Sequence, residues 1–292
     1  MPAWLKRLEP IALQLLGDRR VVRLRAVLDL FGRYGGGLLA AGIAFNTLFA
    51  LIPLAIFVSG LVGILVSDPA ARAGITEFLT GLAPPLAALL DEAVGDLAVA
   101  STSLTIIGLI GAAWGATRLY ASIELGVQAM FSGVKARNLF AKTVRRAVFI
   151  IVIVAIIGAS ILLAFAGSVV GGPGGSETGL LGLVVAIALV ALPYILGILG
   201  IGAIYRFVPP VRPPFSALTP PAIGGGLAIV GVTQIFTLVA PRLVGANVFY
   251  GTLGTVFVAL AWLNLMAMIL LVGAAWVRVR MLTDEEVAAT LE

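Results

Sequence analysis

Six long stretches of the chain contain no charged residue, and they constrain its fold more than any other feature. They are residues 34–67, 97–117, 147–176, 178–205, 213–241 and 243–277. A helix of roughly 20 apolar residues crosses a bilayer core about 30 Å thick. The stretches predict helices 1 to 6 at residues 37–66, 102–123, 147–170, 179–205, 223–241 and 251–277. The predicted fold is all-α, a polytopic bundle of six transmembrane helices.

The composition supports a membrane protein and excludes several kinds of chemistry. Of the 292 residues, 61% are apolar and only 11% are charged, against about 45–50% and about 25% in ordinary globular domains. The chain has no Cys and no His. Disulfides, thiolate or imidazole metal sites and a Ser–His–Asp triad are therefore excluded. We expect no cofactor and no enzymatic activity, although carboxylates alone could in principle hold a metal.

Nearly all positive charges flank the same ends of the predicted helices. Of the 19 Lys and Arg residues, 16 lie before helix 1, between helices 2 and 3, after helix 4 or after helix 6. The positive-inside rule predicts that both termini are cytoplasmic. These cations would also contact anionic lipid headgroups. A nucleic-acid surface needs its cations on one soluble face, so no nucleic-acid partner is expected. The oligomeric state stays open.

The membrane domain at residues 34–280 is flanked by a basic N-terminal segment, residues 1–33, and a short acidic cytoplasmic tail, residues 281–292. In the N-terminal segment, Val21, Leu24, Leu28 and Phe31 share one helical face, with Arg19 and Arg23 roughly opposite. This pattern is typical of an interfacial helix on the inner leaflet. A solvated basic tail that only sets the topology explains it equally well.

Two connecting segments carry structural signals of their own. Between helices 1 and 2, residues 67–101 place apolar side chains on one helical face and acids on the other. They predict an amphipathic helix that rests on the outer leaflet or, as an alternative, closes over a cavity. Residues 208–221 contain six prolines, which favour an extended connector rather than a helix.

Polar residues inside a membrane span are costly, and they are the best indicators of function here. Helix 2 carries Arg118, Glu124 and Gln128. At 100° per residue Arg118 and Glu124 lie about 120° apart, so they cannot pair directly. Arg118 is predicted near the inner end of its helix, where reaching the headgroups is favoured over binding a substrate. Glu124 is the only acid near a span and the candidate proton carrier.

Other predicted helices contribute polar or helix-breaking residues to a candidate substrate pathway. They are Asn46 and Pro53 in helix 1, Gln234 in helix 5, and Tyr250 and Asn264 at or in helix 6. Such amides often only bond to neighbouring helices, and prolines often only kink a helix. The spacing Gly111-x-x-x-Gly115 indicates close helix packing rather than a ligand site.

Four stretches resemble the YihY/BrkB family of bacterial inner-membrane proteins. They are residues 39–57 (LAAGIAFNTLFALIPLAIF), 114–130, 204–210 (IYRFVPP) and 250–277. The resemblance covers residues 30–280 and implies a six-helix protein of the bacterial inner membrane. It also implies that the ribonuclease label once given to the family is mistaken and that transport of a lipid or other amphiphile is the leading activity. Gln128 replaces the usual asparagine of the family, and the usual tyrosine near Asn264 is missing.

The sequence therefore predicts a transporter or a lipid flippase-like protein with a central polar cavity. It contains no ATP-binding signature, so transport would not be ATP-driven by the protein itself. The alternative is a membrane scaffold or partner subunit that transports nothing. Ribonuclease activity would need a soluble basic cleft, and no segment of the chain could form one.

Overall fold

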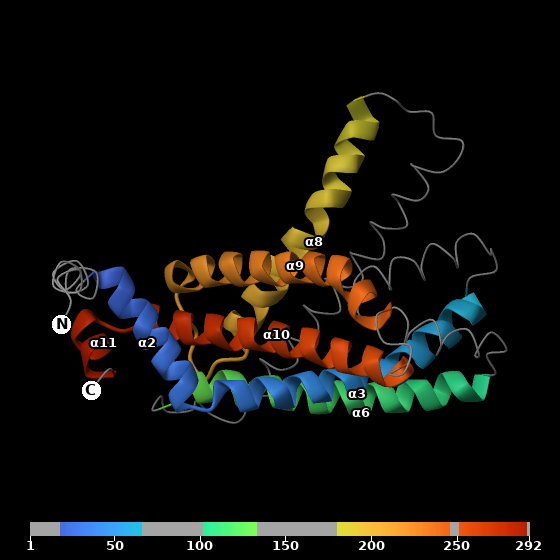
Figure 1. Ribbon diagram of the computed structural model, residues 1–292, viewed down its shortest axis with the longest axis horizontal. Helices are drawn as coiled ribbons and strands as arrows, with labels where there is room; N and C mark the ends of the chain where they lie inside the picture. The colour runs from blue at the N-terminus through green and yellow to red at the C-terminus, as the bar shows by residue number, and fades with distance from the viewer. Residues whose placement is uncertain (1–17, 66–101, 133–179, 246–250, 291–292) are drawn as a thin grey trace.

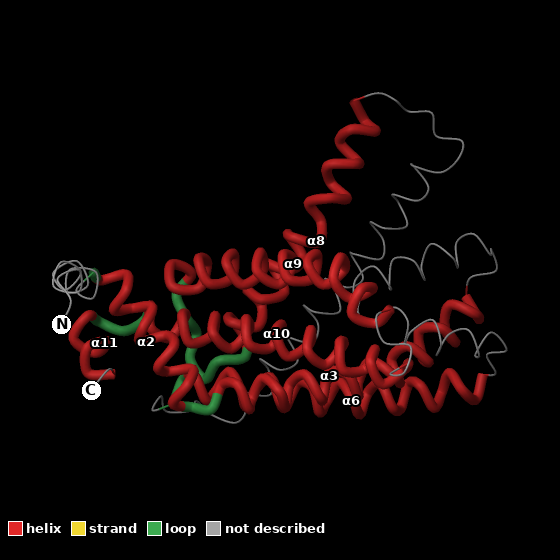
Figure 2. Tube along the Cα trace, in the orientation of Figure 1, coloured by secondary structure: helices red, strands yellow, loops and turns green. Residues whose placement is uncertain are grey.

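The computed structural model describes residues 18–65, 102–132, 180–245 and 251–290, and every regular element in these ranges is a helix (Figure 2). The helices are α2 (Arg19–Arg33), α3 (Gly36–Leu65), α6 (Thr102–Met130), α8 (Leu180–Phe207), α9 (Phe215–Gly245), α10 (Gly251–Arg280) and α11 (Asp284–Thr290). The all-α prediction is confirmed. The predicted helix at 147–170, the amphipathic helix within 67–101 and Tyr250 lie outside the described residues.

Four helices are long and apolar enough to cross a membrane. They contain the segments Gly36–Phe57, Thr105–Met130, Phe215–Val239 and Gly254–Arg280, and α8 adds a shorter apolar segment, Tyr194–Phe207. These segments make the chain a multi-pass membrane protein by length and composition. The count of six spans and their orientation stay predictions.

Two helix boundaries differ from the prediction more than the others. Helix 2 was expected to end at residue 123, but α6 continues to Met130. The polar side chains there do not stop it, because Gln128 bonds to Glu124 one turn earlier, at 2.8 Å, on the same helix. Helix 5 was expected to begin at residue 223, but α9 begins at Phe215. A helix boundary at polar residues is therefore not fixed by hydropathy alone.

The prediction of an extended connector over residues 208–221 is wrong in its second half, because Pro220 and Pro221 lie inside α9. Proline has no backbone N–H, so Pro220 leaves the carbonyl of Ser216 without its usual partner one turn later. The Nη2 atom of Arg280, on α10, donates a hydrogen bond to this carbonyl oxygen at 2.9 Å. A long-range contact thus compensates for the helix-breaking residue.

The α10 helix is the centre of the bundle (Figure 1). It packs between α9 on one side and α3 on the other, and it also contacts α2, α6 and α8. Small residues on α10 are fully buried and allow close approach: Ala259, Ala267, Ala274 and Ala275. The N-terminal half of α8 projects away from the other helices, whereas its C-terminal half packs on α9.

The α3 and α6 helices run antiparallel and touch through glycines. A Cβ atom added at Gly108 would lie 2.6 Å from the backbone nitrogen of Phe57, and one at Gly115 would lie 2.7 Å from the Cα of Ala50. A Cβ atom added at Gly111, between them, would lie 2.8 Å from the Cβ of Pro53. The interpretation of Gly111-x-x-x-Gly115 as a packing motif is confirmed.

The arginines that end or precede the long helices gather at one end of the bundle, here called the basic end (Figure 1). They are Arg33, Arg206, Arg212, Arg278 and Arg280. The α2 helix lies across this end and buries Ala26 and Val27 in the core cluster that includes α10 residues.

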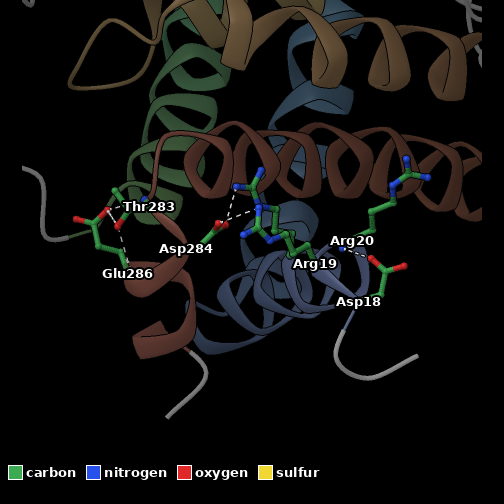
Figure 3. A network of polar contacts seen from close by, with 7 residues as sticks. Asp18, Arg19, Arg20, Thr283, Asp284 and Glu286 are labelled. Carbon is green, nitrogen blue, oxygen red and sulfur yellow. Dashed lines mark hydrogen bonds and ion pairs between the residues drawn. The ribbon is translucent and has the colours of Figure 1, made fainter. Parts of the chain in front are cut away.

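The two terminal segments meet at the basic end (Figure 3). Arg23 Nη2 donates to the Asp284 carboxylate of α11 at 2.9 Å, and Arg19 lies 3.6 Å from the same carboxylate. The hydrogen bond from Arg23 and then the charge of Arg19 hold the pKa of Asp284 below its usual value. Thr283 and Glu286 cap α11 reciprocally, since Glu286 Oε2 accepts from the Thr283 N–H at 2.8 Å. The acidic tail is therefore a docked helix in its described part.

Candidate functional site

The predicted site residues of helix 2, Arg118, Glu124 and Gln128, lie on α6 together with Trp114 and Thr117, and these five residues are called the polar stripe here. At 100° per residue these side chains fall within an arc of about 120°. Thr117, Glu124 and Gln128 point away from the glycines that touch α3 and from Gly126, which faces Leu271 of α10, whereas Arg118 lies only about 20° from Gly111 and borders the contact with α3. Trp114, Thr117 and Arg118 are exposed, while Glu124 and Gln128 are half-buried. The stripe extends along about 21 Å of the helix.

Arg118 lies in the middle of its span rather than near the end. Because α6 continues to Met130, about 18 Å of helix separates Arg118 from that end. The prediction that it sits near the inner end of its helix is therefore wrong. The Cζ atom of Arg118 lies 5.0 Å from the centroid of the Trp114 ring, one turn away, in a cation–π contact. No ion pair of Arg118 occurs within the part of the chain that the structure describes.

Glu124 and Gln128 form the one direct contact between two predicted site residues in the described ranges. Gln128 Nε2 donates to Glu124 Oε1 at 2.8 Å. Arg118 therefore interacts with Trp114 while Glu124 interacts with Gln128, in agreement with the expectation that Arg118 and Glu124 face different neighbours. A role of Glu124 in proton transfer stays a prediction.

Asn46 and Pro53 belong to the surface of α3 that faces α6. Pro53 packs against Gly111, and Ala50 packs against Gly115. The same antiparallel register, continued by one turn, places Asn46 at the depth of Arg118. The Nδ2 atom of Asn46 donates to the Gly42 carbonyl oxygen of its own helix at 2.9 Å. The side-chain N–H of Asn46 therefore has its hydrogen-bond partner within α3. Asn46 lies beside the polar stripe of α6 and is not part of it.

Two polar atoms of α10 are buried without a hydrogen-bond partner among the described residues. They are Oδ1 of Asn264 and Nε1 of Trp262. Trp262 packs in a cluster with Ala44 and Leu48 of α3, and the cluster is flanked by residues of α9. Asn264 lies two turns before Leu271 on the same face of α10, and Leu271 faces Gly126 and Ile43. An unpaired buried polar atom costs about 1–3 kcal/mol, so both atoms need a polar partner.

The remaining predicted residues do not join this group. Gln234 is exposed on α9, and Tyr250 lies outside the described residues. The described site residues thus lie mainly on α3, α6 and α10. Trp262 was not predicted, since a tryptophan in an apolar helix carries no polar signal. Trp114 could have been found as a partner of Arg118, because residues four apart meet on a helix.

The long apolar helices and their basic end define a multi-pass α-helical membrane protein. Comparison with known families gives the assignment: the family model described as virulence factor BrkB matches residues 27–290, and the chain belongs to this family. The resemblance seen in the sequence is confirmed. No curated protein and no solved structure matches the chain.

Proposed function

We propose that the protein moves an amphiphile, such as a lipid, across the membrane with the polar group following the stripe of α6. The observation that carries this proposal is the stripe itself. Polar residues in a span are expected to face the bundle interior or a water-filled cavity. Here Thr117, Glu124 and Gln128 point away from the contacts of α6 with α3 and α10, and the exposed Arg118 borders the contact with α3. Such a stripe offers hydrogen-bonding groups to a headgroup while the acyl chains stay in lipid.

Two neighbouring positions extend the proposed pathway beyond α6. Asn46 lies at the depth of Arg118, and Asn264 holds a buried oxygen with no partner in the described residues. Gln234 and Tyr250 stay predictions for the same pathway. Transport would be passive, driven by a gradient or powered by a partner. Neither enzymatic activity nor a cofactor is part of the proposal.

Reconstitution into liposomes with fluorescent phospholipids in the inner leaflet tests this function. We expect the labelled lipid to reach the outer leaflet faster than in protein-free vesicles. The double variant Glu124→Leu with Gln128→Leu should slow this movement about tenfold. Polar contacts inside membranes are worth about 0.6–1.7 kcal/mol each, and 1.36 kcal/mol is tenfold in rate.

The matched control is Thr219→Val with Thr237→Val on α9. Both threonines are exposed and bond only to carbonyls of their own helix, at 2.7 and 3.0 Å. This variant should transport like the unmodified protein. Rates equal to those of empty vesicles for every lipid and solute tried would overturn the proposal. Copurification of a fixed partner would then favour the scaffold alternative.

We further propose that the protein resides in the bacterial inner membrane with both termini in the cytoplasm and that α2 lies on the anionic inner leaflet. One face of α2 is held to the protein through Ala26, Val27 and Arg23. The opposite face presents Leu24 and Leu28, which are 58% and 54% exposed. The exposed arginines Arg20 and Arg25 flank these leucines. Apolar residues bordered by arginines are typical of helices in the membrane interface.

A spin label at position 28 tests this placement, and the chain has no Cys that would interfere. In vesicles with anionic lipid, a label on Leu28→Cys should lie about 5–10 Å below the headgroups. It should be shielded from a water-soluble relaxation agent and accessible to oxygen. A label on Glu285→Cys, an exposed position of α11, should remain accessible to water. Equal exposure of both labels would refute the interfacial helix.

A further inference from the structure

Arg118 carries a charge in the middle of a span without a neutralising partner among the described residues. A central arginine costs roughly 2.5–3.5 kcal/mol on insertion scales. Its distance from the end of α6 limits escape to the headgroups. Its contact with Trp114 orients the guanidinium but adds no negative charge. Arg118 therefore needs an anion from outside the described residues.

The described residues offer no carboxylate at the level of Arg118. Of its 14 acidic residues, Glu124 is the only one inside the four candidate spans, and residues 133–176 contain none. Glu124 lies about 120° around the helix from Arg118 and about 9 Å along its axis. Its Oε1 atom accepts the hydrogen bond from Gln128. The predicted membrane segments therefore contain no acidic residue that could pair with Arg118.

A second copy of the chain would not supply the carboxylate either. Copies related by a two-fold axis along the membrane normal hold each residue at the same depth. Arg118 of one copy would then lie at the same depth as Arg118 of the other copy. Glu124 of the other copy would be displaced from it by about 9 Å along the helix axis. An apolar dimer contact on this surface would bury two like charges, which is unfavourable.

From this charge inventory we infer that Arg118 and Trp114 form a mid-membrane binding point for a phosphate or carboxylate group, so that the cargo is an anionic amphiphile. The indole covers one face of the guanidinium, and none of the described residues forms an ion pair with the N–H groups at its edge. Two N–H groups of a guanidinium can donate parallel hydrogen bonds to two oxygens of the same phosphate or carboxylate. That this anion is transported rests on the proposed function. The anion-binding site itself rests only on the positions of Arg118 and Trp114.

Binding to the purified full-length protein tests the site independently of transport. Short-chain phosphatidylglycerol, short-chain phosphatidylcholine and inorganic phosphate would each be titrated while the thermal transition is followed in detergent. We expect the glycerol lipid to bind and raise the transition temperature. Arg118→Gln should weaken this binding about ten- to hundredfold, because hydrogen bonds to charged groups are the strong ones. Arg118→Lys, which keeps the charge but loses the paired geometry, should bind with intermediate affinity.

The control variant is Arg212→Gln, which removes an exposed arginine at the basic end and the same net charge. It should bind the anionic lipid as the unmodified protein does. Equal weakening by Arg118→Gln and Arg212→Gln, or equal affinity for phosphatidylcholine, would overturn the anion site. Binding of inorganic phosphate as tight as that of the lipid would identify a free anion rather than a headgroup as the ligand.

The same variants in the liposome assay separate the two proposals. Binding through Arg118 without movement of any lipid would refute the transport function and leave the site. Movement of all lipids at equal rates, with Arg118→Gln slowing all of them equally, would refute the anion preference and leave the function. Selective slowing of the anionic lipid by Arg118→Gln supports both.

Discussion

Alanine at Gly108 or Gly115 is expected to lower the free energy of unfolding by about 1–3 kcal/mol each, the cost of overpacking a close contact. A Cβ at Gly108 would lie 2.6 Å from the nitrogen and 2.9 Å from the Cα of Phe57. A Cβ at Gly115 would meet the Cα of Ala50 at 2.7 Å. Because the obstructing atoms belong to the backbone, only separation of α3 from α6 relieves the clash. Reversible unfolding in mixed detergent measures the loss.

Gly42→Ala and Gly231→Ala are the matched controls for this prediction. They lie in α3 and α9, and a Cβ at either position meets nothing within 4 Å. Alanine favours a helix over glycine by about 1 kcal/mol, so these variants should be as stable as the unmodified protein or more so. If all four substitutions had the same effect, the glycine contact between α3 and α6 would be wrong.

Much of the helical architecture could be predicted because long uncharged runs can form little else in a membrane. The run at residues 34–67 predicted a helix at 37–66, and α3 occupies Gly36–Leu65. The predicted start at residue 251 coincides with that of α10, Gly251. Burial of apolar side chains dominates these segments, so hydropathy suffices there.

The helix ends could not be predicted where polar residues and prolines govern them. The α9 helix includes Pro220 because Arg280, far along the chain, donates to the carbonyl that this proline leaves unpaired. The residues around Pro220 in the sequence give no sign of this hydrogen bond, because Arg280 lies 64 residues after Ser216. The end of α6 was likewise placed too early, since the polarity of Glu124 and Gln128 resembled a membrane boundary.

The site was predicted in its residue types but not in its geometry. The cost of polar groups in lipid singled out Arg118, Glu124 and Gln128, and all three lie along one side of α6. The position of Arg118 along its candidate span depends on where α6 ends, so the boundary predicted at residue 123 placed near the inner end an arginine that lies in the middle of the helix. The Nε1 atom of Trp262, which has no partner among the described residues, is buried by the packing of three helices, so its burial could not be anticipated from the sequence.

Truncation of Tyr205 to alanine should be among the most destabilising changes in the described part of the chain, costing about 3–5 kcal/mol as for other large buried aromatics. Its side chain is fully buried, and its hydroxyl donates to the Leu270 carbonyl oxygen at 2.9 Å. Gly225 of α9 lies against the same hydroxyl. Tyr205 therefore joins α8, α9 and α10. Tyr205→Phe, which keeps the ring, should cost only about 1 kcal/mol.

A double-mutant cycle with Gly273 tests whether the hydroxyl is seated as described. A Cβ at Gly273 would collide with the Tyr205 hydroxyl and lie 2.8 Å from its Cζ. Gly273→Ala should therefore destabilise the unmodified protein strongly and the Tyr205→Phe variant less, with a coupling of about 0.5–3 kcal/mol. Unfolding in mixed detergent measures all four corners of the cycle. Additive effects would mean that the hydroxyl does not approach α10, and the contact that fixes α8 to the centre of the bundle would have to lie elsewhere.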